Sequence, residues 1–140
     1  MWSYYNPSNI IFKTGALDHL SSLNIIEKKK YCIFTYPDPI FKKHVKKIID
    51  ALGEPLLVVD NIQPNPDYKN LKVISEQYQD IKKDNQQIIC LGGGSVIDSA
   101  KFITFGLGDF NYTVDFLEKR TKYQKLNHPE IISIPTTAGT

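Results

Sequence analysis

Short runs of apolar, often β-branched residues alternate along this chain with segments in which apolar residues recur every three or four positions. The runs predict strands, because β-branched residues favour extended backbone and turn residues flank each run. The expected strands are residues 9–13, 31–35, 55–59, 87–91 and 131–134. Strands that alternate with helices are typical of a parallel sheet. The pattern therefore predicts an α/β domain with helices on both faces of a parallel sheet.

The periodic segments predict the helices. The clearest follows residue 38, where four apolar residues share one stripe: Phe41, Val45, Ile48 and Leu52. Asp38 is placed to cap this helix, Pro39 suits its first position, and Gly53 ends it. Further helices are expected after Gly15, from about Asp67 through Ile81, after Ser95, and near Tyr112 to Glu118.

Composition and charge exclude several classes of protein. The chain has 140 residues, 41% of them hydrophobic, and a net charge of +2, which is too small to indicate a nucleic-acid or membrane partner. Cys32 and Cys90 both lie in predicted strands, where a free thiol packs as a small apolar group, so no disulfide is expected. With no leader-like or membrane-spanning segment in the sequence, we expect a cytoplasmic protein.

The strongest local signal is the turn Gly92-Gly93-Gly94-Ser95, which joins a predicted strand to a predicted helix. The first turn of a helix presents free backbone N–H groups and the positive end of the helix dipole, which together bind anions. Glycines let phosphate oxygens approach, and the Ser95 hydroxyl can add a hydrogen bond. The alternative is a tight turn that binds nothing. Its position at the carboxyl end of a strand favours a ligand site.

The turn matches neither a Walker A loop nor the usual Gly-x-Gly-x-x-Gly fingerprint. Residues 92–101, Gly-Gly-Gly-Ser-Val-Ile-Asp-Ser-Ala-Lys, instead closely resemble the signature of the iron-containing alcohol dehydrogenases. Three other stretches resemble that family in the same order: Asn6 to Leu17, Pro64-Asn65-Pro66, and Ile134 to Thr140. The resemblance covers nearly the whole chain. It implies the Rossmann-like N-terminal domain of the dehydroquinate synthase-like fold, which binds a dinucleotide.

The resemblance also implies roles for individual residues. Gly93, Gly94 and Ser95 would hold the cofactor pyrophosphate, and Asp98 would orient that loop or meet the ribose. Asn65 would approach the nicotinamide side of the cofactor. Three threonines would contact the cofactor from the opposite wall: Thr136, Thr137 and Thr140. Without a ligand, Asp98 has a simpler explanation, since the helix dipole stabilises a carboxylate near the N-terminus.

Cofactor choice depends on the end of the strand at residues 31–35. The family commonly places an aspartate there, and this chain has Tyr36. Without that carboxylate nothing repels a 2′-phosphate, so the resemblance favours NADP, with Lys42 or Lys43 able to reach the phosphate. Asp38 could restore a preference for NAD if the turn places its carboxylate near the adenosine ribose.

The metal of the family is not expected to be bound by this chain. In the family an aspartate and three histidines downstream of the Thr136–Thr140 segment hold Fe²⁺ or Zn²⁺, which polarises the substrate oxygen. His19, His44 and His128 are scattered and lack helical spacing, so we expect them to face solvent. Residues 1–140 are thus expected to be a truncated dinucleotide-binding domain, inactive without a helical metal-binding domain.

The parent enzyme implied by the resemblance transfers a hydride between NAD(P) and a small alcohol or aldehyde. A glycerol dehydrogenase-like or dehydroquinate synthase-like enzyme is an alternative within the same superfamily, and a non-catalytic nucleotide-binding module is an alternative of another class. The family also suggests a homodimer that pairs through its N-terminal strands, since an unpaired edge strand invites pairing.

Overall fold

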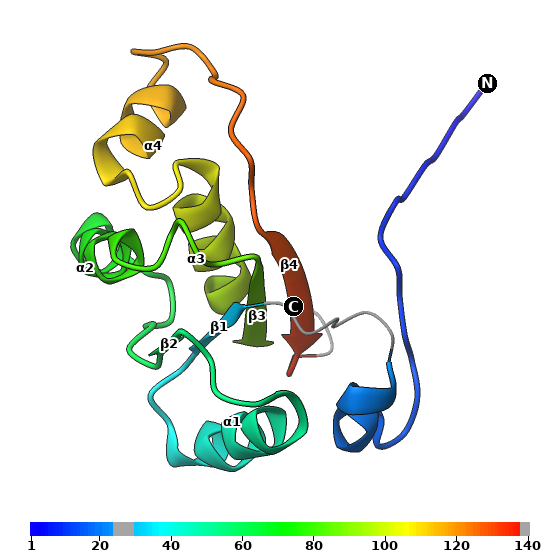
Figure 1. The fold of residues 1–140 in the computed structure, drawn as a ribbon. Coiled ribbons are helices and arrows are strands. Elements are labelled where there is room, and N and C mark those ends of the chain that lie inside the picture. The colour runs from blue at the N-terminus through cyan, green and yellow to red at the C-terminus, as the bar shows by residue number, and fades with distance from the viewer. Residues whose placement is uncertain (24–29, 138–140) are drawn as a thin grey trace.

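The computed structural model describes residues 1–23 and 30–137. Its centre is a parallel sheet of four strands in the order β2-β1-β3-β4 (Figure 1). The strands are β1 (Tyr31–Thr35), β2 (Leu57–Val59), β3 (Gln87–Gly92) and β4 (Glu130–Pro135). The connecting helices are η1 (Ala16–Ser22, a 3₁₀ helix), α1 (Pro39–Leu52), α2 (Tyr68–Gln79), α3 (Gly94–Phe105) and α4 (Phe110–Leu117). The predicted α/β class and parallel sheet are confirmed.

Helices cover both faces of the sheet, as predicted. In Figure 1, α1 and η1 lie on one side of the strands and α2, α3 and α4 on the other. Alternate residues of the central strands point to the two sides. Cys32, Phe34, Ile88 and Cys90 join the cluster under α2 and α3, whereas Ile33, Ile89 and Leu91 join the cluster under α1 and η1. Both faces of β1 and β3 are therefore buried, as parallel sheets require.

The helix ends follow the turn chemistry of the sequence. Pro39 begins α1 after Asp38, and Gly53 ends it with a φ of 88°, which favours glycine. The Asp38 side chain makes no capping hydrogen bond. Asp67 does cap α2, because its carboxylate accepts a hydrogen bond of 2.8 Å from the Asn70 N–H. This cap fixes the point at which the Pro64–Pro66 loop enters the helix.

Three strand predictions differ from the structure. The strand expected at residues 9–13 is wrong, since residues 1–13 form no strand and are exposed. The strand expected at 55–59 is shorter, Leu57–Val59, and only Val59 is buried, because β2 is an edge strand with one neighbour. The strand expected at 131–134 is longer, Glu130–Pro135, and forms β4 at the other edge, where its residues are exposed or half-buried.

The two cysteines and the lengths of the helices can be compared with the sequence predictions. Cys32 and Cys90 are buried and free, as expected. Burial raises the pKa of both thiols, to about 12 for Cys90, so they stay protonated and unreactive. Of the helices in the described part of the chain, none has the length and apolar character that crossing a membrane requires.

Candidate functional site

Three adjacent strands end at the same edge of the sheet. The parallel register pairs Thr35 of β1 with Leu91 of β3, and Gly92 of β3 with Pro135 of β4. The buried Thr35 hydroxyl donates to the Leu91 carbonyl at 2.9 Å, and the Thr136 N–H donates to the Gly92 carbonyl at 3.1 Å. The residues that follow these strands, predicted to bind one ligand, therefore emerge side by side.

The glycine turn has one closed side and one open side. Gly93 is buried at the start of α3, and a Cβ placed on it would lie 3.2 Å from Thr137 Cγ2 and 3.3 Å from the Tyr36 hydroxyl. Gly94 is exposed, and a Cβ placed on it meets no atom within 4 Å. A ligand can therefore approach the turn beside Gly94. Tyr36 and Thr137 occupy the space beside Gly93.

The helix dipole and the free N–H groups at the start of α3 both favour an anion at this open side. The N–H groups of Val96 and Ile97 bond back to the Gly93 carbonyl at 3.1 and 3.3 Å. Gly94 and Ser95 therefore carry the leading N–H groups of the helix, which have no partner within it. An anion at this point gains the N–H donors together with the positive end of the dipole.

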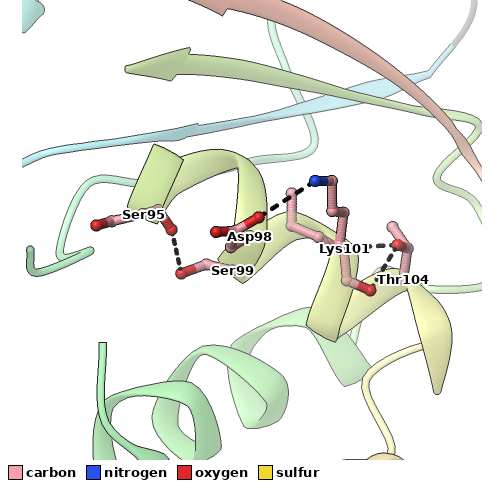
Figure 2. A network of polar contacts seen from close by, with 6 residues as sticks. Ser95, Asp98, Ser99, Lys101 and Thr104 are labelled. Atoms are coloured by element: carbon pink, nitrogen blue, oxygen red, sulfur yellow. Dashed lines mark hydrogen bonds and ion pairs between the residues drawn. The ribbon is translucent and has the colours of Figure 1, made fainter. Parts of the chain in front are cut away.

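Ser95 connects α3 to the loop that contains Asn65. The Asn65 N–H donates to the Ser95 hydroxyl oxygen at 3.0 Å, across thirty positions of sequence. Figure 2 shows the other side of Ser95, where the Ser99 hydroxyl donates to the Ser95 carbonyl at 2.8 Å. Ser99 was not predicted as a site residue from the sequence. Its place four residues after Ser95, on the same helix face, is the signal that could have found it.

A hollow of about 370 Å³ lies beside this connection. It brings together three residues that the sequence assigned to the cofactor, Asn65, Ser95 and Asp98, with four others: Pro66, Leu71, Ser99 and Phe102. The Asp98 side chain is exposed and pairs with Lys101 at 3.2 Å, one turn further along α3 (Figure 2). This ion pair therefore runs along the helix, away from the glycine turn.

A second hollow, of about 150 Å³, lies at the carboxyl ends of β1 and β2. Tyr36 lines it, with Thr35, Lys42, Val45, Val58 and Asp60. Asp38 is at the start of α1 and is not one of these residues. Asp60 was not predicted from the sequence, although it directly follows the apolar run at residues 55–59 and so stands at a strand end, as Tyr36 does.

The remaining predicted residues are placed as follows. Thr136 and Thr137 are exposed, and Thr137 lies on the Tyr36 side of Gly93. Thr140 lies outside the described residues. The structure thus gathers Tyr36 and Thr137 beside Gly93, and it gathers Asn65, Ser95 and Asp98 around the hollow of about 370 Å³.

The described residues do not fit a metal ion. Within residues 1–23 and 30–137, no three His, Cys, Asp or Glu side chains lie together in a group that could hold one. Two of the histidines instead face backbone carbonyls: His44 Nδ1 lies 3.0 Å from the Ile40 oxygen, and His128 Nδ1 lies 2.8 Å from the Thr104 oxygen.

A parallel sheet whose glycine turn opens a helix at its carboxyl edge is the architecture of the dinucleotide-binding α/β domains. The family model described as iron-containing alcohol dehydrogenase matches residues 7–140. The chain belongs to the iron-containing alcohol dehydrogenase family.

Known relatives agree in sequence and in fold. The NADP-dependent alcohol dehydrogenase 3 of Entamoeba histolytica is 29% identical over 76% of this chain and 27% of its own length. Alcohol dehydrogenase 4 of Saccharomyces cerevisiae is 30% identical over 98% of this chain and 36% of its own length. The sulfoacetaldehyde reductase of Bifidobacterium kashiwanohense, solved in complex with NAD⁺, superposes with a TM-score of 0.78 at 24% identity, covering 100% of this chain and 37% of that one. The chain therefore spans about a third of the length of these relatives.

Proposed function

We propose that this chain forms the nicotinamide dinucleotide-binding part of an NAD(P)-dependent alcohol dehydrogenase or aldehyde reductase. The observation that carries the proposal is the open side of the glycine turn. There Gly94 is exposed and a Cβ placed on it meets no atom within 4 Å, at the point where α3 begins at the carboxyl edge of a parallel sheet. Membership of the family supports the same reading.

The proposed roles follow the two sides of the turn. The N–H groups of Gly94 and Ser95 hold the pyrophosphate, and Gly93 keeps the backbone close enough for them to do so. Asn65 and Asp98 lie along the side that leads to the nicotinamide. The threonines form the opposite wall: Thr136, Thr137 and Thr140. The bound cofactor supplies the hydride, and these residues hold and orient it.

The hollow at the ends of β1 and β2 is proposed to take the adenosine ribose. Lys42 lines it beside Tyr36, which supports NADP, because an ammonium group attracts the 2′-phosphate. Asp60 lines the same hollow and favours the free ribose hydroxyls of NAD. We favour NADP, with Tyr36 and Lys42 as its contacts. Asp38, the residue that would favour NAD, does not line this hollow. Lys42→Ala should weaken NADPH binding and leave NADH binding nearly unchanged, as fluorescence titration of both cofactors would measure.

The activity of the whole protein is part of the same proposal. It would transfer a hydride reversibly between the cofactor and a small alcohol or aldehyde. The ligands of an iron or zinc ion would have to come from outside the described residues. A homodimer that pairs through the exposed N-terminal segment, and a cytoplasmic location, complete the proposal. The two buried free thiols support a reducing compartment.

The direct test is titration of the protein with NADH and NADPH, followed by cofactor fluorescence. The Gly94→Val variant should lose binding, because its side chain fills the space that the phosphate needs, while its fold persists. Gln77→Val, at an exposed position of α2, is the control for a valine placed on a helix surface. If wild-type protein binds neither cofactor at millimolar concentration, or if Gly94→Val binds normally, the proposal is wrong.

A further inference from the structure

The loop before α2 reaches across to α3 through its backbone. The contact is the 3.0 Å hydrogen bond from the Asn65 N–H to the Ser95 hydroxyl oxygen. Asn65 has a φ of 51°, in the left-handed region that most residues avoid. It also precedes Pro66, and a residue before proline normally adopts an extended conformation. Asn65 therefore holds an unfavourable backbone conformation while its N–H meets Ser95.

Neighbouring interactions hold the loop in this shape. Pro64 and Pro66 each restrict their own φ on either side of Asn65. At the far end, the Asp67 carboxylate caps α2 through the Asn70 N–H, and the Asn70 side-chain amide donates to the Asn61 carbonyl at 3.2 Å. Strained backbone persists where the surroundings determine it, and it concentrates at functional sites.

The hydrogen bond has a chemical consequence for Ser95. A serine hydroxyl has one hydrogen to donate and two lone pairs to accept. Because Asn65 donates to the oxygen, the oxygen is fixed in position and its hydrogen remains available to a further acceptor. The Ser95 carbonyl is already occupied by the Ser99 hydroxyl. An anion at the start of α3 would therefore meet an O–H donor whose oxygen is already held in place, which lowers the entropic cost of binding.

We propose that Asn65 is a positioning residue for the diphosphate of the cofactor, and that it acts through its backbone N–H and left-handed conformation by orienting the Ser95 hydroxyl. This inference rests on the proposed dinucleotide function and goes beyond it. It assigns the role of Asn65 to the backbone, whereas the family resemblance suggests a contact between Asn65 and the nicotinamide side of the cofactor. A residue at position 65 that adopts a positive φ should therefore serve as well as asparagine.

The test compares Asn65→Gly with Asn65→Val in the intact protein. Glycine adopts the left-handed conformation freely, and a β-branched valine does not. NADPH, NADH and ADP serve as probes, because all three carry the diphosphate and only two carry nicotinamide. We expect Asn65→Val to weaken all three by about tenfold, the size of one charge-assisted hydrogen bond. Asn65→Gly should stay within about twofold of wild type.

A double-mutant cycle separates positioning from general damage to the loop. If Asn65 acts through Ser95, then adding Asn65→Val to Ser95→Ala should cause no further loss of ADP binding. Amide hydrogen exchange gives a readout without ligand: exchange at Asn65 should speed up in Ser95→Ala, which removes the acceptor. Additive losses in the cycle, or unchanged exchange, would overturn the inference.

The outcomes also separate this inference from the proposed function. If the wild-type protein binds none of the three probes, both the proposed function and the inference about Asn65 are wrong. Wild-type binding, with equal losses for the glycine and valine variants confined to NADH and NADPH, keeps the function and overturns the inference. That pattern would assign Asn65 a side-chain contact with nicotinamide. Rescue by glycine, together with non-additivity in the cycle, supports the backbone role.

Discussion

The N-terminal segment and the β3–α3 junction carry similar local sequences and have opposite structural outcomes. Each contains a short run of β-branched and aromatic or apolar residues, which a glycine follows within a few positions. In β3, Ile88 and Ile89 are fully buried. In the N-terminal segment, Ile10 is 75% exposed and Phe12 is fully exposed. The same local pattern therefore gives a core strand in one place and an exposed segment in the other.

Neighbours in the sheet account for the difference. β3 pairs with β1 on one side and with β4 on the other, so its backbone groups are bonded and both of its faces are covered. Residues 1–13 form no strand and pair with none of the described strands. Strand propensity reflects how well a side chain packs on a pleated, half-buried sheet surface. It does not produce a strand where no such surface is present. The exposed apolar side chains of this segment are what supports the proposed pairing with a second copy.

The largest effect is expected from a matched pair of isoleucine truncations. Ile89→Ala should lower the free energy of unfolding by roughly 2–5 kcal/mol, because it leaves a cavity in the core between β3 and α1. Ile10→Ala should change it by less than about 0.5 kcal/mol, as exposed positions do. Denaturant unfolding of both variants measures the contrast. A loss above about 1 kcal/mol for Ile10→Ala that depends on protein concentration would mean that the segment is buried between two copies.

A pair of glycine substitutions probes the junction itself. A Cβ on Gly92 would lie 2.5 Å from Val96 Cγ2, so Gly92→Ala should destabilise the fold by roughly 1–3 kcal/mol through overpacking. Gly94→Ala meets no neighbour and gains helix propensity, so its stability should hold or rise.

Cofactor affinity should respond differently from stability in the Gly94→Ala variant. Gly94→Ala should bind NADPH less tightly than wild type, since its methyl group lies on the open side of the turn. Thermal unfolding and cofactor titration are the two measurements. If Gly94→Ala were the less stable variant of the pair, the open side of the turn inferred here would be filled in solution.

Much of the fold could be predicted because its local and tertiary requirements agree. Tyr31–Thr35 was placed correctly from its apolar run alone, and α1 from its stripe together with Pro39 and Gly53. The glycine turn at 92–95 could be proposed as a site because its residues are contiguous in sequence. These features depend on neighbours a few positions away, which a sequence displays directly.

The features that were missed depend on distant partners. The strand expected at residues 9–13 needed a neighbouring strand, and nothing in its own residues could show that none was there. Asp60 joins Tyr36 and Lys42 in one hollow only because β2 and β1 are adjacent in the sheet. The hydrogen bond from Asn65 to Ser95 likewise depends on how the loop crosses to α3. Such contacts depend on which strands and loops are neighbours in the fold, and the periodicity of the sequence does not show this.

The α2 side of the sheet should respond to alkaline pH. Burial raises the pKa of Tyr78 from its usual 10.0 to about 12, partly offset by the hydrogen bond that Asn85 donates to its hydroxyl. The folded state therefore holds the phenol proton more tightly than the unfolded state. This contribution is complete below pH 10 and is lost as the pH rises to about 12. Stability should fall more steeply over that range in wild type than in Tyr78→Phe, and parallel curves would contradict the assignment.

The smallest effect is expected where the N-terminal segment joins the body of the protein. Lys47 of α1 donates a hydrogen bond to Asp18 of η1, and this contact holds the pKa of Asp18 below its usual 3.8. A lowered folded-state pKa stabilises the protein above pH 3.8, and the effect disappears as the pH falls through the lowered value. Both side chains are about half exposed, at 51% and 54%, so salt screens the pair.

Asp18→Asn should therefore lower the thermal midpoint slightly at neutral pH and low salt. The thermal midpoint of Asp18→Asn should match that of wild type at acid pH or in high salt. The control is Asp50→Asn, which removes the exposed Lys46–Asp50 ion pair within α1, a pair that does not reach η1. A difference between Asp18→Asn and wild type that survives at acid pH would assign the anchoring of η1 to packing. Such packing would involve Leu20, the residue of η1 that is buried in the cluster under α1.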